Sequence, residues 1–216
     1  MSMIVKNEGG SSIPILEEGV YTAVCTGLID LGFQENKMFN SNSRKVQIVW
    51  TIPDEKIKYT DKDGNEKEAM RQMSKEYTAC ITEKSNLNKD LTSWRGQSFT
   101  EEEMKGFDLN KLLLVPCQIQ VVHQGKEKKY ANIAGIMSLP KGMKIPTEGL
   151  QKQIFDMSES NTWNTYENLP KFIQDKITKS IGFEGSDLDN YIKGLGYLTK
   201  NEKEGLKEIT EDDLPF

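Results

Sequence analysis

The chain has 216 residues, of which 36% are hydrophobic and 28% are charged. This length suits one domain with an appendage or two small domains, and the composition excludes a membrane protein and a fully disordered chain. Three well-separated cysteines and a single histidine argue against a disulfide scaffold and a CxxC zinc module, and they exclude a histidine-based metal centre.

The net charge of −5 is unevenly distributed along the chain. Residues 1–150 contain 20 basic and 20 acidic side chains, whereas residues 151–216 contain 8 and 13. A net acidic chain argues against nucleic-acid binding, but a neutral body can still gather its basic side chains on one face. The other interpretation is that the negative charge serves solubility alone.

The first 18 residues are polar and irregular, and we interpret them as a flexible arm. They lack a basic segment followed by an apolar run, and no apolar run in the chain approaches the ~18 residues of a membrane span. We therefore expect a cytoplasmic protein with no membrane partner.

Three strands are predicted in the first part of the chain. The first covers residues 20–33, where Gly27 and Gly32 indicate a bulge or a sharp bend. The second covers residues 44–52, with Val46, Ile48, Trp50 and Ile52 on one side, and Pro53 is expected to end it. After a charged turn around Gly64, the third covers residues 73–82.

A helical stretch of about 30 residues follows the third predicted strand. Leu87, Leu91 and Trp94 recur at helical spacing, which predicts an apolar stripe that includes Trp94 in the core. Residues 100–103, Thr-Glu-Glu-Glu, form a capping box, and Asp108 is a plausible cap for the next turn.

Two more strands, 116–124 and 129–137, read as a hairpin, and helical pieces are expected between residues 150 and 198. The predicted fold is mainly β with helical additions. It is a five-stranded OB-like barrel with a helical insert between strands 3 and 4, plus a C-terminal helical segment and an acidic tail. A β-sandwich with a helical insertion and an α+β domain are the alternatives. The expected segments are an arm (1–18), an OB-like domain (19–142), a helical extension (143–198) and an acidic, disordered interaction tail (199–216).

The chain ends in Glu211, Asp212, Asp213, Leu214, Pro215 and Phe216. Acidic residues followed by an apolar side chain and a terminal carboxylate suit a basic groove that has an apolar pocket. This ending resembles the acidic tips of bacterial and phage single-stranded DNA-binding proteins, which end in Asp-Asp-x-Pro-Phe. The resemblance implies that the tip recruits replication and repair proteins, and that it can compete with DNA for the protein's own basic surface.

A second resemblance spans about residues 20–142. It is carried by residues 83–87, 94–96, 99–104, 106–109 and 130–133, which look like a small phage and prophage family associated with OB-fold DNA-binding proteins. The chain departs from the bacterial proteins in its linker, which is short and charged where theirs is long and rich in Gly, Gln and Pro. The resemblance implies a phage protein that acts in the cytoplasm of a bacterial host.

A surface for single-stranded DNA needs basic side chains for phosphates and aromatic faces for bases. Three sequence clusters offer both, and in OB folds the loops between strands 1 and 2 and between strands 4 and 5 flank the groove. The candidate DNA-binding residues are Phe33, Lys37, Phe39, Arg44, Lys45, Lys58, Tyr59, Lys126, Lys128, Lys129 and Tyr130. The cluster around Lys58 is the weakest, because neighbouring acidic residues dilute its charge.

No nucleotide-binding loop, nucleophile elbow or metalloprotease motif occurs, so we expect no enzyme, no cofactor and no bound metal. The sequence predicts a protein that binds single-stranded DNA without sequence preference in phage DNA replication or recombination, and homo-oligomers are compatible with it. The alternative is an adaptor that uses the same tip to bind replication or recombination proteins but has no DNA affinity of its own.

Overall fold

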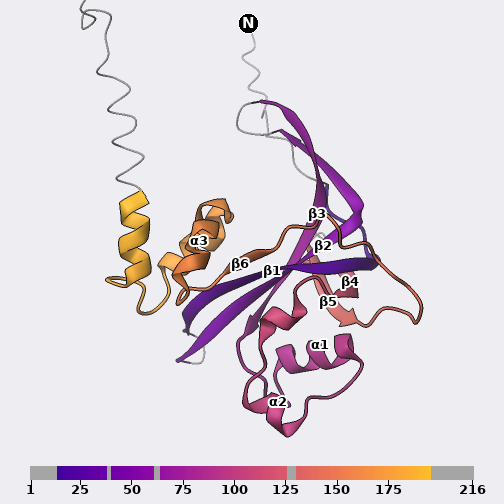
Figure 1. Ribbon diagram of the computed structural model, residues 1–216, viewed down its shortest axis with the longest axis horizontal. Coiled ribbons are helices and arrows are strands. Elements are labelled where there is room, and N and C mark those ends of the chain that lie inside the picture. The colour runs from indigo at the N-terminus through magenta and orange to yellow at the C-terminus, as the bar shows by residue number, and fades with distance from the viewer. Residues whose placement is uncertain (1–13, 38–39, 61–63, 126–129, 196–216) are drawn as a thin grey trace, which may run out of the picture. The chain divides into compact units, whose positions relative to one another are not determined.

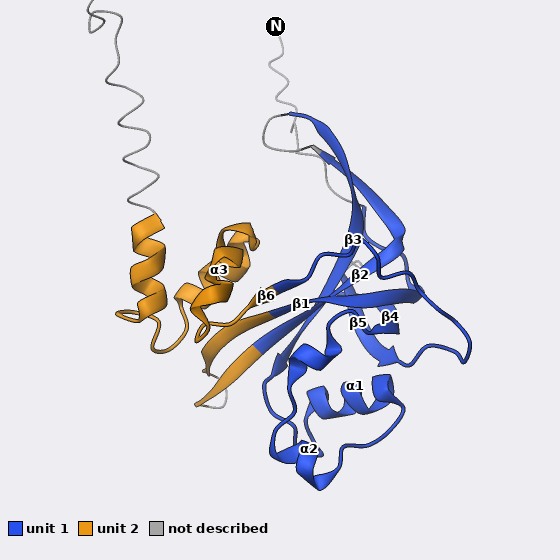
Figure 2. Ribbon diagram, viewed as in Figure 1, with its two compact units in different colours: residues 1–28, 46–153 blue, residues 29–45, 154–216 orange. Residues whose placement is uncertain are grey.

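The computed structural model describes residues 14–37, 40–60, 64–125 and 130–195 (Figure 1). The chain forms two compact units, and strands β1 and β2 pass from one into the other (Figure 2). Unit 1 comprises residues 1–28 and 46–153, and unit 2 comprises residues 29–45 and 154–216. Residues 199–216, the predicted acidic tail, lie outside the described part.

A curled antiparallel sheet is the main architectural feature. Its strands are β1 (Gly19–Asn36), β2 (Ser41–Thr60), β3 (Glu66–Thr78), β4 (Pro116–Gln124) and β5 (Tyr130–Met137), in the spatial order β3-β2-β1-β4-β5. The short β6 (Gln153–Phe155) also pairs with β1. The two ends of this order, β3 and β5, contact each other, so the five strands form a half-barrel. The prediction of a mainly β fold with helical additions is confirmed, and the half-barrel is consistent with an OB-like barrel.

Several strand boundaries differ from the predicted ones, and those of β2 and β3 differ most. Strand β2 continues through Pro53 to Thr60, because a proline removes one ladder donor without forcing the backbone out of the extended region. Strand β3 begins at Glu66 rather than Met73. Its early part is largely exposed, so no apolar alternation marks it in the sequence. Cys80, which lies within the predicted strand 73–82, follows the end of β3 and is exposed.

The helices between β3 and β4 begin and end at the residues that the sequence marks. Helix α1 (Asn86–Arg95) is capped by Ser85, whose side chain accepts from the Asn88 N–H, and it ends at Gly96 in the left-handed conformation. Helix α2 (Glu101–Lys105) starts with the complete capping box of Thr100 and Glu103. The 3₁₀ helix η1 (Leu109–Leu112) is capped by Asp108, as predicted.

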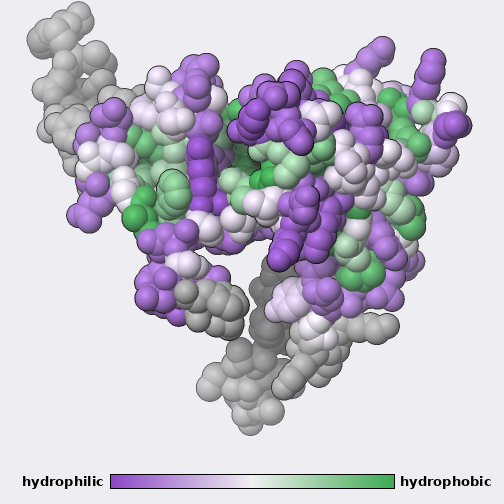
Figure 3. All heavy atoms as spheres, turned by 90° about the horizontal axis from the view of Figure 1, so that it is seen from below, coloured by the Kyte–Doolittle hydropathy of each residue, from purple (hydrophilic) through white to green (hydrophobic). Residues whose placement is uncertain are grey.

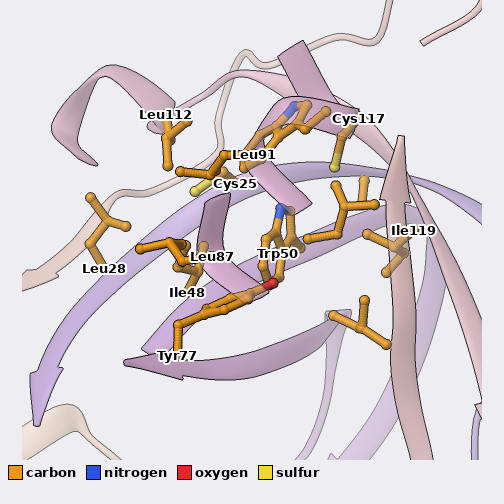
Figure 4. Close-up of a cluster of buried hydrophobic side chains, with 14 of the residues drawn as sticks. Cys25, Leu28, Ile48, Trp50, Tyr77, Leu87, Leu91, Leu112, Cys117 and Ile119 are labelled. Atoms are coloured by element: carbon orange, nitrogen blue, oxygen red, sulfur yellow. The ribbon is translucent and has the colours of Figure 1, made fainter. Parts of the chain in front are cut away.

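The core of unit 1 lies inside the curled sheet (Figure 4). Side chains from all five strands and from α1 contribute, and Trp50 is fully buried. The rings of Trp50 and Trp94 lie 5.9 Å apart, and the Trp94 indole donates to the Pro116 carbonyl at 3.0 Å. Helix α1 contacts both β3 and β5, so its apolar stripe covers the ends of the sheet order.

Two irregularities keep apolar side chains on the inner face. In β1 the inward positions change parity between Cys25 and Leu28, across Gly27, where the sequence predicts a bulge or bend. In β5 the pairing with β4 shifts between Gln120 and Val121, so Ile133 and Ile136 are both buried although they are three residues apart. An uninterrupted strand would place them on opposite faces.

Unit 2 has a separate core built around α3 (Lys171–Thr178) and the 3₁₀ helix η3 (Ser160–Asn168). Residues 187–195 are helical, as the sequence predicts. Phe155 and Tyr166 pack with ring centres 6.0 Å apart, and Ile173 and Ile177 are buried. Gly32 adopts φ +69°, and a Cβ there would lie 2.7 Å from the Met157 sulfur, so glycine is required on both counts.

We expect Gly27→Ala to lower the free energy of unfolding by about 1–3 kcal/mol, because an added Cβ would lie 2.9 Å from the Val49 Cβ. The matched control is Gly135→Ala, where the nearest atom is 3.8 Å away and we expect a change below about 0.5 kcal/mol. Urea denaturation followed by tryptophan fluorescence measures both. Equal losses in the two variants would contradict the close approach at Gly27.

Candidate nucleic-acid interface

The predicted cluster near the β1–β2 turn lies in unit 2. Phe33 is 51% exposed, and its carbonyl accepts the Ile181 N–H at 2.8 Å in an isolated antiparallel bridge. Residues paired across such a bridge share one face, so Ile181, itself 48% exposed, lies beside Phe33. Lys37 is exposed, and Phe39 lies outside the described residues. Phe33 therefore offers an accessible ring with an aliphatic neighbour.

Arg44 is held by carboxylates of unit 2. Its Nη2 lies 2.7 Å from Asp30 Oδ2, its Nε donates to Asp30 Oδ1 at 3.2 Å, and Asp156 Oδ1 lies 3.6 Å away. The hydrogen bonds that Arg44 donates to Asp30 raise the pKa of Arg44, with added attraction from the carboxylates of Asp30 and Asp156. A phosphate at Arg44 would compete with this bidentate pair. In the sequence, the position of Asp30 within the apolar run Leu28–Leu31 was the signal that could have predicted a basic partner such as Arg44. Lys45 is half-buried.

Lys58, Tyr59 and Tyr130 lie in unit 1, and the pairing of β1 relates them to one another. Gly19, the first residue of β1, pairs with Val121, and the Thr22 hydroxyl hydrogen-bonds to Asp54 at 3.3 Å. Beyond these points, the β4–β5 hairpin continues to Tyr130, and the β2–β3 hairpin continues to Tyr59 on β2. Both hairpins thus extend past the same end of β1. Lys126, Lys128 and Lys129 lie outside the described residues.

These two hairpins carry accessible tyrosine rings. Tyr130 is 66% exposed and stands opposite Gln124 in the β4–β5 register, and Tyr59 is 36% exposed beside the exposed Lys58. Part of the basic charge on the β2–β3 hairpin is neutralised, because Lys56 pairs with Glu68 at 2.9 Å. At Lys56, therefore, an acidic neighbour offsets the basic charge, as the sequence predicts for this cluster.

Sequence reasoning missed an arginine-centred cluster in the helical insert. The Arg95 guanidinium lies 4.3 Å from the centre of the Phe99 ring and 5.3 Å from that of Phe107, and it bonds to Glu103. Asp90, five residues before Arg95, pairs instead with Lys75 at 2.7 Å. The spacing of Arg95, Phe99 and Glu103 at four-residue intervals was the available signal.

Cys25 and Cys117 are fully buried. Burial raises the pKa of Cys25 to about 12 and that of Cys117 as well. At neutral pH both are therefore thiols, which are poor nucleophiles. In the described ranges no three His, Cys, Asp or Glu side chains gather in a way that could hold a metal ion. None of the helices in this part of the chain is long and apolar enough to span a membrane.

Comparison with known proteins gives no match to a family model, a curated protein or a solved structure. The interpretation of this surface therefore rests on the residues themselves.

We expect the folded protein to react with iodoacetamide at Cys80 and not at Cys25 or Cys117, because only Cys80 is exposed. Mass spectrometry after brief labelling at about pH 8 should show one modified thiol among the three, and all three in urea. Rapid labelling of Cys25 or Cys117 without denaturant would contradict the packed interior of the half-barrel.

Proposed function

We propose that the protein binds single-stranded DNA without sequence preference and acts in phage DNA replication or recombination. The observation that carries the proposal is the extension of two hairpins past one end of β1, each with an accessible tyrosine beside lysine in the sequence. Tyrosine faces can stack on any base, and lysines can neutralise phosphates. The half-barrel supports the proposal because it is consistent with an OB-like fold, in which the loop between strands 4 and 5 is one of the two that flank the groove.

The acidic segment Glu211–Phe216 has the second role in this proposal, the recruitment of replication or recombination proteins. Its support is chemical, since carboxylates steer toward a basic partner over a distance and Leu214 and Phe216 supply apolar contacts. The same segment carries the negative charge that single-stranded DNA carries, so it would compete with DNA for a basic surface.

Tyr59→Ala and Tyr130→Ala should each weaken the binding of a fluorescently labelled oligothymidylate, with a loss of about 1–3 kcal/mol per lost stacking contact. The matched control is Phe172→Ala in unit 2, an aromatic side chain that is also 66% exposed. Fluorescence anisotropy at low salt measures all three variants. Equal affinity in the control and the two tyrosine variants would refute stacking at the hairpins.

The affinity of the intact protein should fall steeply with salt, with a slope of about −0.7 per phosphate contact. Lys58→Gln should reduce that slope by about one contact, whereas Lys105→Gln should leave it unchanged, since Lys105 pairs with Glu102 at 2.9 Å. Removal of residues 207–216 should tighten binding. If neither form binds at low salt, the DNA proposal fails and the adaptor function takes its place.

A further inference from the structure

A pocket of about 430 Å³ lies in unit 1, at the junction of the helical insert with β4 and the segment after β5. Its lining includes Arg95, Glu103, Phe107, Lys111, Val115 and Leu139. None of the candidate DNA-binding residues that the structure describes lines it. The face of the molecule shown in Figure 3 is largely hydrophilic, with smaller hydrophobic areas between the charged side chains.

Arg95 gives this pocket a fixed positive charge. Its side chain is 17% exposed, and the guanidinium carbon lies over the Phe99 ring, 4.3 Å from the ring centre. Its Nη2 bonds to Glu103, whereas Nη1 is buried and has no hydrogen-bond acceptor in the described part of the chain. Glu103 therefore satisfies only part of the guanidinium, and the positive charge of Arg95 stays available to an anionic group in the pocket.

The charges around the pocket leave an excess of one positive charge, because the lining contains Arg95 and Lys111 against Glu103 alone. Both oxygens of Glu103 already accept hydrogen bonds, one from Arg95 and one from the Thr100 N–H. Lys111 is exposed, and its ammonium lies 5.8 Å from the centre of the Phe107 ring. The complementary ligand therefore carries a carboxylate or another anionic group.

The rest of the lining determines which anion fits best. Trp94 is only 3% exposed, and the Phe107 ring already contacts the edge of Phe99 and two cations, so neither presents a free face for a nucleobase. Val115 and Leu139 instead form an aliphatic wall, and Val115 is 37% exposed. Such a wall suits a branched aliphatic side chain better than a flat base.

We infer that this pocket binds an acidic peptide of a partner protein, in which a carboxylate side chain stands next to a leucine or a similar residue. The carboxylate interacts with Arg95 and Lys111, and the aliphatic side chain packs against Val115 and Leu139. This is a second protein-binding site, and it does not depend on the proposed DNA surface.

A labelled, end-blocked Asp-Asp-Leu-Leu peptide, titrated into the full-length protein by fluorescence anisotropy, tests the inference. Asn-Asn-Leu-Leu and Asp-Asp-Ser-Ser should each bind at least about fivefold more weakly, since each lacks one of the two recognised groups. Because the peptides change and the protein does not, this comparison is independent of protein folding. Equal binding of all three peptides, or no binding, would overturn the inference.

Two exposed positions locate the binding on the protein. Lys111→Glu and Val115→Glu should each weaken the binding of the Asp-Asp-Leu-Leu peptide by about tenfold through repulsion. The control for Lys111→Glu is Lys84→Glu, the same charge change on an exposed residue that lines no described pocket. This control should change the affinity less than about twofold. Circular dichroism checks that each variant is folded. A labelled trithymidylate that loses affinity in Lys111→Glu while the peptide does not would assign the pocket to nucleic acid and overturn the inference.

Discussion

The packing of Trp94 against Trp50 is the interaction on which unit 1 depends. Trp50 fills the interior of the curled sheet, and Trp94 reaches it from α1 while its indole N–H satisfies a carbonyl at the start of β4. One side chain thereby connects the helical insert, the centre of the sheet and its fourth strand. Asp90 adds a second connection, since it accepts from both Lys75 and Tyr77 on β3 at 2.7 Å. Burial and the nearby carboxylate raise the pKa of Tyr77, so its hydroxyl remains a donor at neutral pH.

The use of charge differs between the two units. In unit 2 the arginine nearest the β1–β2 turn is committed to Asp30 and Asp156, and Asp30 also accepts the Gly32 N–H. This network ties the turn to the start of the C-terminal segment within that unit. In unit 1 Lys58 on the β2–β3 hairpin is exposed, and the proposed DNA contacts concentrate on the hairpins of that unit. A basic residue in the sequence is thus evidence for a phosphate site only after its carboxylate partners are known.

The sequence predicted the parts of the fold that depend on local chemistry. Residue spacing identified Val46, Ile48, Trp50 and Ile52 as inward, and the capping residues Thr100 and Asp108 marked two helix starts. The full length of β2 and β3 was missed because their extensions lack a buried face, and periodicity records burial rather than hydrogen bonding. The candidate site was predicted less well. Whether Arg44 is free or paired depends on residues 14 and 112 positions away, and no local pattern reports such contacts.

The passage of β1 and β2 from one unit into the other has a consequence for dissecting the protein. Unit 2 is discontinuous in the chain, because residues 29–45 enter and leave it as a strand pair before residues 154–216 complete it. A single cut near residue 153 would leave the strand pair attached to unit 1 without Phe155, Tyr166 and the α3 side chains that complete its core. The exposed apolar edges of such a fragment would favour aggregation. The two units are separable only by replacing residues 29–45 with a short turn, and not by shortening the chain.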